Sequence, residues 1–148
     1  MDKSAEKLIL IIDDQESDQQ VLARSLRRLG VLNPVHRLGD GHEAMRYLNG
    51  DTPYGDRTTF PFPAIIFLDL NLPLVNGWEV LDWVHGLSLK GASELFVYSE
   101  VKNVNEVRRI YDLGADSFLR KPVNELDLMN LIYHFPKHWN IQREKTQS

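Results

Sequence analysis

Apolar residues in this sequence form two kinds of pattern, and the first kind predicts strands. Two uninterrupted apolar runs, residues 8–12 and 64–68, each stop at an aspartate. Runs of five apolar residues without alternation are typical of strands buried on both faces, as in a parallel sheet. Shorter segments predict three more strands, at residues 35–38, 95–98 and 117–119.

The second pattern is apolar recurrence at three- and four-residue spacing, which predicts helices between the strands. Two of the expected helices span residues 41–48 and 78–84, and the second carries Val80, Leu81 and Val84 on one face. The other three are expected from the apolar stripes Val21, Leu22, Leu26 and Leu29; Val104, Val107, Ile110 and Tyr111; and Leu128, Met129, Ile132 and Phe135. Gly30 and Gly114 follow two of these stripes as helix stops, and Pro136 ends the last one. Strands that alternate with helices predict an α/β fold with a parallel sheet and right-handed crossovers.

Two segments lie outside this alternation. Residues 51–63 are long for a connection and contain three prolines with Tyr54, Phe60 and Phe62. Connections of this length are commonly functional or disordered, and the sequence leaves the role of this one open. Residues 137–148 are polar apart from Trp139 and Ile141.

Composition narrows the class of protein. A chain of 148 residues accommodates one domain, and a net charge of −4 gives no basic surface for nucleic acid. The absence of cysteine excludes disulfides, thiol catalysis and cysteine-ligated metals. The longest apolar run is too short to cross a bilayer, and the N-terminus lacks the pattern of a signal peptide. We therefore expect a cytoplasmic protein without a membrane segment.

Polar residues follow four of the predicted strands. Asp13 and Asp14 come after the first strand, Asp69 after the third, Ser99 after the fourth and Lys121 after the fifth. A single aspartate after a strand is commonly a turn residue or a helix cap. Five such residues on four strands instead predict a site, because open α/β sheets bind ligands at the carboxyl ends of their strands.

The residue types at this edge favour phosphoryl chemistry. Three neighbouring carboxylates repel one another unless a cation neutralises them, and an oxygen-only set without His or Cys suits Mg²⁺. A lysine and a hydroxyl add hydrogen-bond donors. One carboxylate can then attack a phosphoryl group while the cations stabilise the charge on its oxygens.

The motifs carrying these residues resemble the receiver domain of two-component response regulators. The matching segments are residues 11–15, 67–73 with Gly77, 97–99 and 113–122, and the resemblance covers residues 7–135. It implies a flavodoxin-like, doubly wound sheet of five parallel strands in the order 2-1-3-4-5 with five flanking helices. The remaining segment, residues 136–148, is too short for an output domain, so we expect a single-domain regulator.

The resemblance also implies a role for the acidic residues. Asp69 would accept a phosphoryl group from a sensor histidine kinase. Asp14, Asp69 and the backbone carbonyl of Asn71 would bind Mg²⁺, and Asp13 would act through a metal-bound water. Such a protein is a phosphoacceptor that catalyses the transfer from its donor and slowly dephosphorylates itself, rather than a turnover enzyme.

Three further residues have implied roles, and two others depart from the family. Ser99 and Lys121 would contact the phosphoryl group, and Phe118 lies at the switch aromatic three residues before the lysine. Glu100 replaces the usual small residue beside the site, where it either crowds the phosphoryl group or points to solvent. Asn76 replaces a common acidic residue, with no expected consequence.

The expected partners follow from the same resemblance. The long connection and aromatic tail are similar to those of single-domain regulators that partner bacterial phytochromes, so the kinase could be of phytochrome type. A downstream protein or phosphotransfer protein would read the signal. The predicted fourth and fifth helices, the last strand and the tail offer a surface for a homodimer, and its candidate anchors are Tyr111, Tyr133, Phe135, His138 and Trp139. The alternative is that Tyr111 and Phe135 belong to the buried stripes of their helices and that Trp139 folds back over the edge of the domain.

Two other functions stay open at this point. An aspartyl-nucleophile phosphotransferase or phosphatase, like the haloacid dehalogenases, would carry an Asp-x-Asp nucleophile after its first strand, where this chain has adjacent Asp13 and Asp14. A pseudo-receiver acting as a phosphorylation-independent scaffold is supported only by Glu100. Stable single phosphorylation distinguishes the switch from both.

Overall fold

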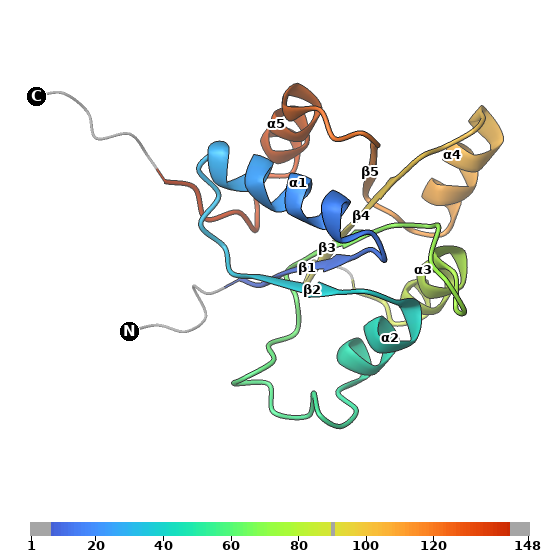
Figure 1. Ribbon diagram of the computed structural model, residues 1–148. Helices are drawn as coiled ribbons and strands as arrows, with labels where there is room; N and C mark the ends of the chain where they lie inside the picture. The colour runs from blue at the N-terminus through green and yellow to red at the C-terminus, as the bar shows by residue number, and fades with distance from the viewer. Residues whose placement is uncertain (1–6, 90, 143–148) are drawn as a thin grey trace, which may run out of the picture.

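The computed structural model describes residues 7–89 and 91–142 (Figure 1). Five parallel strands form one sheet in the order β2-β1-β3-β4-β5, as the resemblance to receiver domains implies. The strands are β1 (Ile9–Ile12), β2 (Val35–Leu38), β3 (Ile65–Leu68), β4 (Glu94–Ser99) and β5 (Ser117–Arg120). The helices are α1 (Glu16–Arg28), α2 (Gly41–Asn49), α3 (Gly77–His85), α4 (Val104–Asp112) and α5 (Glu125–His134).

The sheet separates two hydrophobic cores. Every residue of β1 and β3 is buried, which explains their continuous apolar runs. The core on one face takes Ala44 from α2, Val80 from α3 and Ile110 from α4. The other face is covered by α1 and α5 (Figure 1), which contribute Leu26 and Leu128. Within the described residues, no helix is both long enough and apolar enough to cross a membrane.

The predicted helices are all present, but four residues of their predicted apolar stripes face solvent. Val21, Met129 and Tyr111 are between 43% and 46% exposed, and Val104 is 70% exposed. Each helix covers only one face of the sheet, so its buried strip is narrower than the run of apolar residues. In α4 only Ile110 is buried, and in α5 the buried residues are Leu128 and Leu131, the second of which the predicted stripe omitted.

The long connection between α2 and β3 is packed against α2. Tyr54 is buried, and its ring lies 5.0 Å from the ring of Tyr47 and 5.2 Å from that of Phe60. Arg57 donates hydrogen bonds to the carbonyls of Tyr47, Leu48 and Phe60, which satisfies the C-terminal end of α2. Of the two expectations for such a segment, disorder is therefore wrong.

The described part of the tail folds back onto the domain. The indole of Trp139 is stacked on Phe96, with ring centroids 6.2 Å apart, and donates to the carbonyl of Phe135 at 2.7 Å. His138 is also buried. Trp139 and His138 are therefore buried in their own chain, and of the two alternatives for the tail the structure has Trp139 folded back onto the domain. Tyr111 and Tyr133 are exposed.

Gly77 allows α3 to begin directly behind the carboxyl end of β3. A Cβ atom at this position would lie 2.1 Å from the carbonyl oxygen of Asp69, which is too close for any side chain. Asn76 caps the helix by accepting a hydrogen bond from the backbone N–H of Glu79. The Asn76–Gly77 pair thus fixes the turn that follows Asp69.

Candidate functional site

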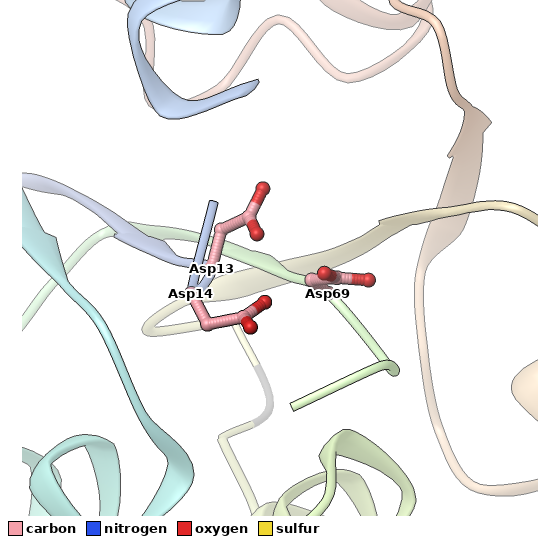
Figure 2. Close-up of side chains that lie close together, drawn as sticks. All are labelled: Asp13, Asp14 and Asp69. Atoms are coloured by element: carbon pink, nitrogen blue, oxygen red, sulfur yellow. The ribbon is translucent and has the colours of Figure 1, made fainter. Parts of the chain in front are cut away.

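Three aspartates meet at the carboxyl edge of the sheet. Asp13 and Asp14 follow β1, and Asp69 follows β3, the neighbouring strand (Figure 2). Asp13 and Asp69 are buried, whereas Asp14 is exposed. One carboxylate oxygen from each lies within 4.8 Å of the other two. The parallel pairing of β1 with β3 brings together residues that are more than fifty positions apart in the chain.

Asp69 has donors on both carboxylate oxygens. Its Oδ1 accepts from the backbone N–H of Asn71 at 3.1 Å and from the Ser99 hydroxyl at 2.9 Å. Its Oδ2 accepts from the Lys121 ammonium at 3.2 Å. Burial raises the pKa of Asp69 above its usual value, and the charge of Asp13 adds to this, although the hydrogen bonds and Lys121 oppose it.

Lys121 is the central cation of the site. Its ammonium contacts Asp13 at 2.8 Å, Asp18 at 3.0 Å and Asp69 at 3.2 Å, and its side chain is only 10% exposed. Burial lowers the pKa of Lys121, but the hydrogen bonds to Asp13 and Asp18 and the charge of Asp69 outweigh it, so the net pKa is raised. The ammonium therefore stays protonated across the physiological range.

Asp13 is held by neighbours in addition to Lys121. The backbone N–H of Gln15 donates to its Oδ1 at 2.9 Å, and the Tyr98 hydroxyl donates to its Oδ2 at 2.5 Å. Gln19 donates to the backbone carbonyls of Asp13 and Leu38, which ties the start of α1 to β1 and β2. Burial, followed by the hydrogen bond to Asp13, raises the pKa of Tyr98, so its phenol remains a donor.

Three residues of the site were not predicted from the sequence: Asp18, Gln19 and Tyr98. Asp18 gave only a weak signal, since acidic residues in a first helical turn are common through their interaction with the helix dipole. In the sequence pattern, Tyr98 is indistinguishable from the other apolar residues of its strand, and Gln19 from other polar residues of its helix. Their roles depend on contacts across the sheet, including the 85-residue separation between Tyr98 and Asp13.

The acidic cluster has the properties of a divalent cation site. All of its side-chain donors are oxygens, two of the three carboxylates are buried, and their oxygens converge. Oxygen ligands of this kind suit Mg²⁺, which uses few carboxylates and retains several waters. A cavity of about 340 Å³ lies beside Asp13 and Asp14, with Arg37 and Gln19 also in its wall.

Two other sequence-predicted residues lie away from the carboxylates. Glu100 is exposed and points to solvent, the second of the two orientations considered for it. Phe118 is half-buried, packs at the edge of the core on the α4 side and lies 6.3 Å from the ring of Tyr111. Ser99 lies at the end of β4, and Phe118 lies on the adjacent strand β5.

The sequence and fold of this chain are similar to those of known proteins. A model of the response regulator receiver domain matches residues 9–133. The probable methanogenesis regulatory protein FilR2 of Methanothrix harundinacea is 29% identical over 132 residues, which are 89% of this chain and 83% of FilR2. The bacteriophytochrome response regulator RtBRR is 30% identical, with a TM-score of 0.79 over 93% of this chain and 82% of RtBRR. The Mn²⁺-bound response regulator Rcp1, a protein of Synechocystis, is 26% identical, with a TM-score of 0.74 over 93% of this chain and 99% of Rcp1.

Proposed function

This chain belongs to the response regulator receiver domain family, and on that premise we propose that Asp69 is its phosphoacceptor. The observation that carries the proposal is the surrounding of Asp69: a buried carboxylate that contacts the Ser99 hydroxyl and the Lys121 ammonium beside two further aspartates. The phosphoryl donor is the phosphohistidine of a sensor histidine kinase. The protein acts as a phosphorylation-dependent switch.

The transfer exchanges one phosphorus bond for another. A carboxylate oxygen of Asp69 attacks the phosphorus, the P–N bond of the phosphohistidine breaks, and its electron pair returns to the imidazole. The product is an acyl phosphate on Asp69. Lys121 and Ser99 donate to the phosphoryl oxygens and so stabilise the charge that is transferred. Hydrolysis of this acyl phosphate is slow, so the chain is a switch rather than a turnover enzyme.

The divalent ion of the proposal is Mg²⁺. Asp14, Asp69 and the backbone carbonyl of Asn71 would hold it directly, and Asp13 through a bound water. The ion supplies positive charge that offsets the repulsion between the carboxylates and the incoming phosphoryl group. The oxygen-only donor set supports this assignment, and the Mn²⁺-bound form of the related regulator Rcp1 supports a divalent cation at such a site.

The output of the switch is a rearrangement around β5. The phosphoryl group attracts the Ser99 hydroxyl, which leaves space for Phe118 to rotate inward and changes the surface formed by α4 and β5. If Ser99→Ala still accepts phosphate and binds its partner with unchanged dependence on phosphorylation, this coupling is wrong.

The partners follow from the related proteins. The likeness to RtBRR supports a phytochrome-type histidine kinase, and the signal passes to a downstream protein or phosphotransfer protein. The exchange takes place in the cytoplasm, where the kinase obtains its ATP. Any homodimer would use the exposed Tyr111 and Tyr133, because Trp139 is buried in its own chain.

Acetyl phosphate labelling tests the central assignment. With Mg²⁺ present, intact-mass spectrometry should show one added phosphoryl group on the wild-type chain and none on Asp69→Asn. Circular dichroism of the variant controls for folding. Equal labelling of both proteins would refute the assignment, and continuous turnover of a small phosphoester would favour a phosphatase instead.

A further inference from the structure

Lys121 has a third carboxylate partner that belongs neither to the acidic cluster nor to the proposed transfer step. Asp18, in the first turn of α1, accepts from the Lys121 ammonium at 3.0 Å. The other two acceptors are Asp13 and Asp69, at 2.8 Å and 3.2 Å. An ammonium group has three N–H donors, so three carboxylates occupy all of them. The contact to Asp69 is the longest of the three.

We propose that Asp18 is a positioning residue that restrains phosphoryl binding, because it occupies one N–H donor of the Lys121 ammonium and adds negative charge beside Asp69. The inference rests on the function proposed for Asp69 and goes beyond it. In the resting site Asp18 competes for the donor that a phosphoryl group on Asp69 would need. Its effect is to make phosphorylation less favourable.

Distances within the site give the size of the electrostatic effect. Since both Asp18 and Asp69 contact the same nitrogen, their Oδ2 atoms lie no more than about 6 Å apart. The Asp18 side chain is 42% exposed, so water screens part of the repulsion. At this separation near the surface, the negative charge of Asp18 should weaken the binding of a phosphoryl-like anion at Asp69 by about three- to tenfold.

An opposing effect is smaller. Asp18 would favour phosphoryl binding if it held the Lys121 ammonium in the orientation that contacts the phosphoryl oxygens. However, Lys121 keeps two other restraints without it: the 2.8 Å contact with the buried Asp13, and the face of the Tyr98 ring, whose centroid is 4.7 Å from the ammonium. Removal of the Asp18 charge therefore leaves the ammonium in place and frees one donor.

Beryllofluoride, an analogue of the phosphoryl group, tests the inference. Its dissociation constant is measured by isothermal calorimetry at saturating Mg²⁺ for wild type, Asp18→Asn and Asp18→Glu. We expect Asp18→Asn to bind about three- to tenfold more tightly, with a smaller gain at high ionic strength. Asp18→Glu, which restores the carboxylate, should stay within about twofold of wild type. Affinity for Mg²⁺ alone should not rise in Asp18→Asn, since the variant lacks one nearby negative charge.

Asp127→Asn is a matched control. Asp127 is the third residue of α5, as Asp18 is of α1, so the two substitutions remove the same charge from the same position in a helix. Asp127 lines a different cavity, beside β5. The control should leave beryllofluoride affinity unchanged.

Each result has one meaning. Unchanged or weaker beryllofluoride binding by Asp18→Asn overturns the inference, and so does an equal gain in Asp127→Asn. Failure of the wild-type chain to bind beryllofluoride with Mg²⁺ refutes the proposed function itself, before any variant is compared.

Discussion

The two ends of the parallel sheet are both closed by buried polar groups, but they use opposite chemistry. At the carboxyl end, Asp13, Asp69 and Lys121 are charged and share contacts. At the amino end, a neutral side-chain amide makes hydrogen bonds to backbone groups. The side chain of Asn33 is completely buried and donates to the carbonyls of Lys7 and His138. Its oxygen accepts from the backbone N–H of Asn140 at 2.7 Å.

This difference separates a structural end from a functional end. Each polar atom of the Asn33 side chain has a complementary partner, so its burial contributes to stability. The carboxyl end instead holds like charges close together, and under the proposed function it would gain its full complement of interactions only with a cation and a phosphoryl group bound. Substitutions at the amino end should therefore lower stability, and those at the carboxyl end should change binding.

The largest effect on stability is expected from Trp139→Ala. Loss of the ring stacked on Phe96 should lower the free energy of unfolding by about 3–5 kcal/mol, as for other buried aromatic truncations. Urea denaturation measures this value. Tyr133→Ala, which removes a 79% exposed aromatic side chain, is the control and should cost less than about 0.5 kcal/mol. Equal losses in both variants would mean that the tail does not pack as described.

Asn33→Ala comes next. It removes three hydrogen bonds that a completely buried side chain makes, so we expect a loss of about 2–3 kcal/mol. Asn105→Ala, at an exposed position of α4, should be nearly neutral. Acetyl phosphate labelling of the Asn33 variant should persist where the protein is folded. Selective loss of labelling with unchanged stability would place Asn33 in the function of the site and break the comparison.

Asp14→Ala should act in the opposite direction. Without divalent ions the substitution relieves repulsion from Asp13 and Asp69 and should raise the free energy of unfolding by about 0.5–1 kcal/mol. The same variant should bind Mg²⁺ more weakly, which a fluorescence titration measures. A loss of both stability and binding would contradict the view that this end is under electrostatic strain.

The smallest effect concerns the pH dependence of the amino end. Burial lowers the pKa of His138 below its usual 6.5, Lys7 and Lys137 lower it further, and Asp116 opposes them. The unfolded chain then binds a proton more readily than the folded one. Stability is therefore full above about pH 6.5 and falls as the pH drops toward the folded pKa, by no more than about 1.4 kcal/mol per pH unit.

His138→Phe removes this titration and should flatten the slope of stability against pH. Burial also lowers the pKa of His36, so His36→Gln serves as the parallel variant. It should remove only the part of the pH dependence of stability that comes from His36. An unchanged slope in His138→Phe would mean that His138 does not titrate differently in the folded and unfolded chains.

The local apolar pattern was enough to predict an α/β fold with a parallel sheet, whereas the order of the strands followed from the resemblance to receiver domains. The runs in β1 and β3 are apolar throughout because both of their faces are buried, and this is visible without any tertiary contact. A polar residue at a strand's carboxyl end reaches the ligand edge in any fold of this class, so Asp13, Asp69 and Lys121 could be identified from their order in the chain.

Other features were decided only by the tertiary structure. Trp139 is buried and Val104 is exposed because of what lies beside them, and helical spacing carries no information about those neighbours. Asp18 and Tyr98 acquire a role through Lys121 and Asp13, which are more than eighty residues away in sequence. The sequence by itself determined which chemical groups reach the edge of the sheet, because strand direction is a local property. Which donors share each carboxylate depends on distances between strands and helices. These distances are set only when the sheet and the helices pack together.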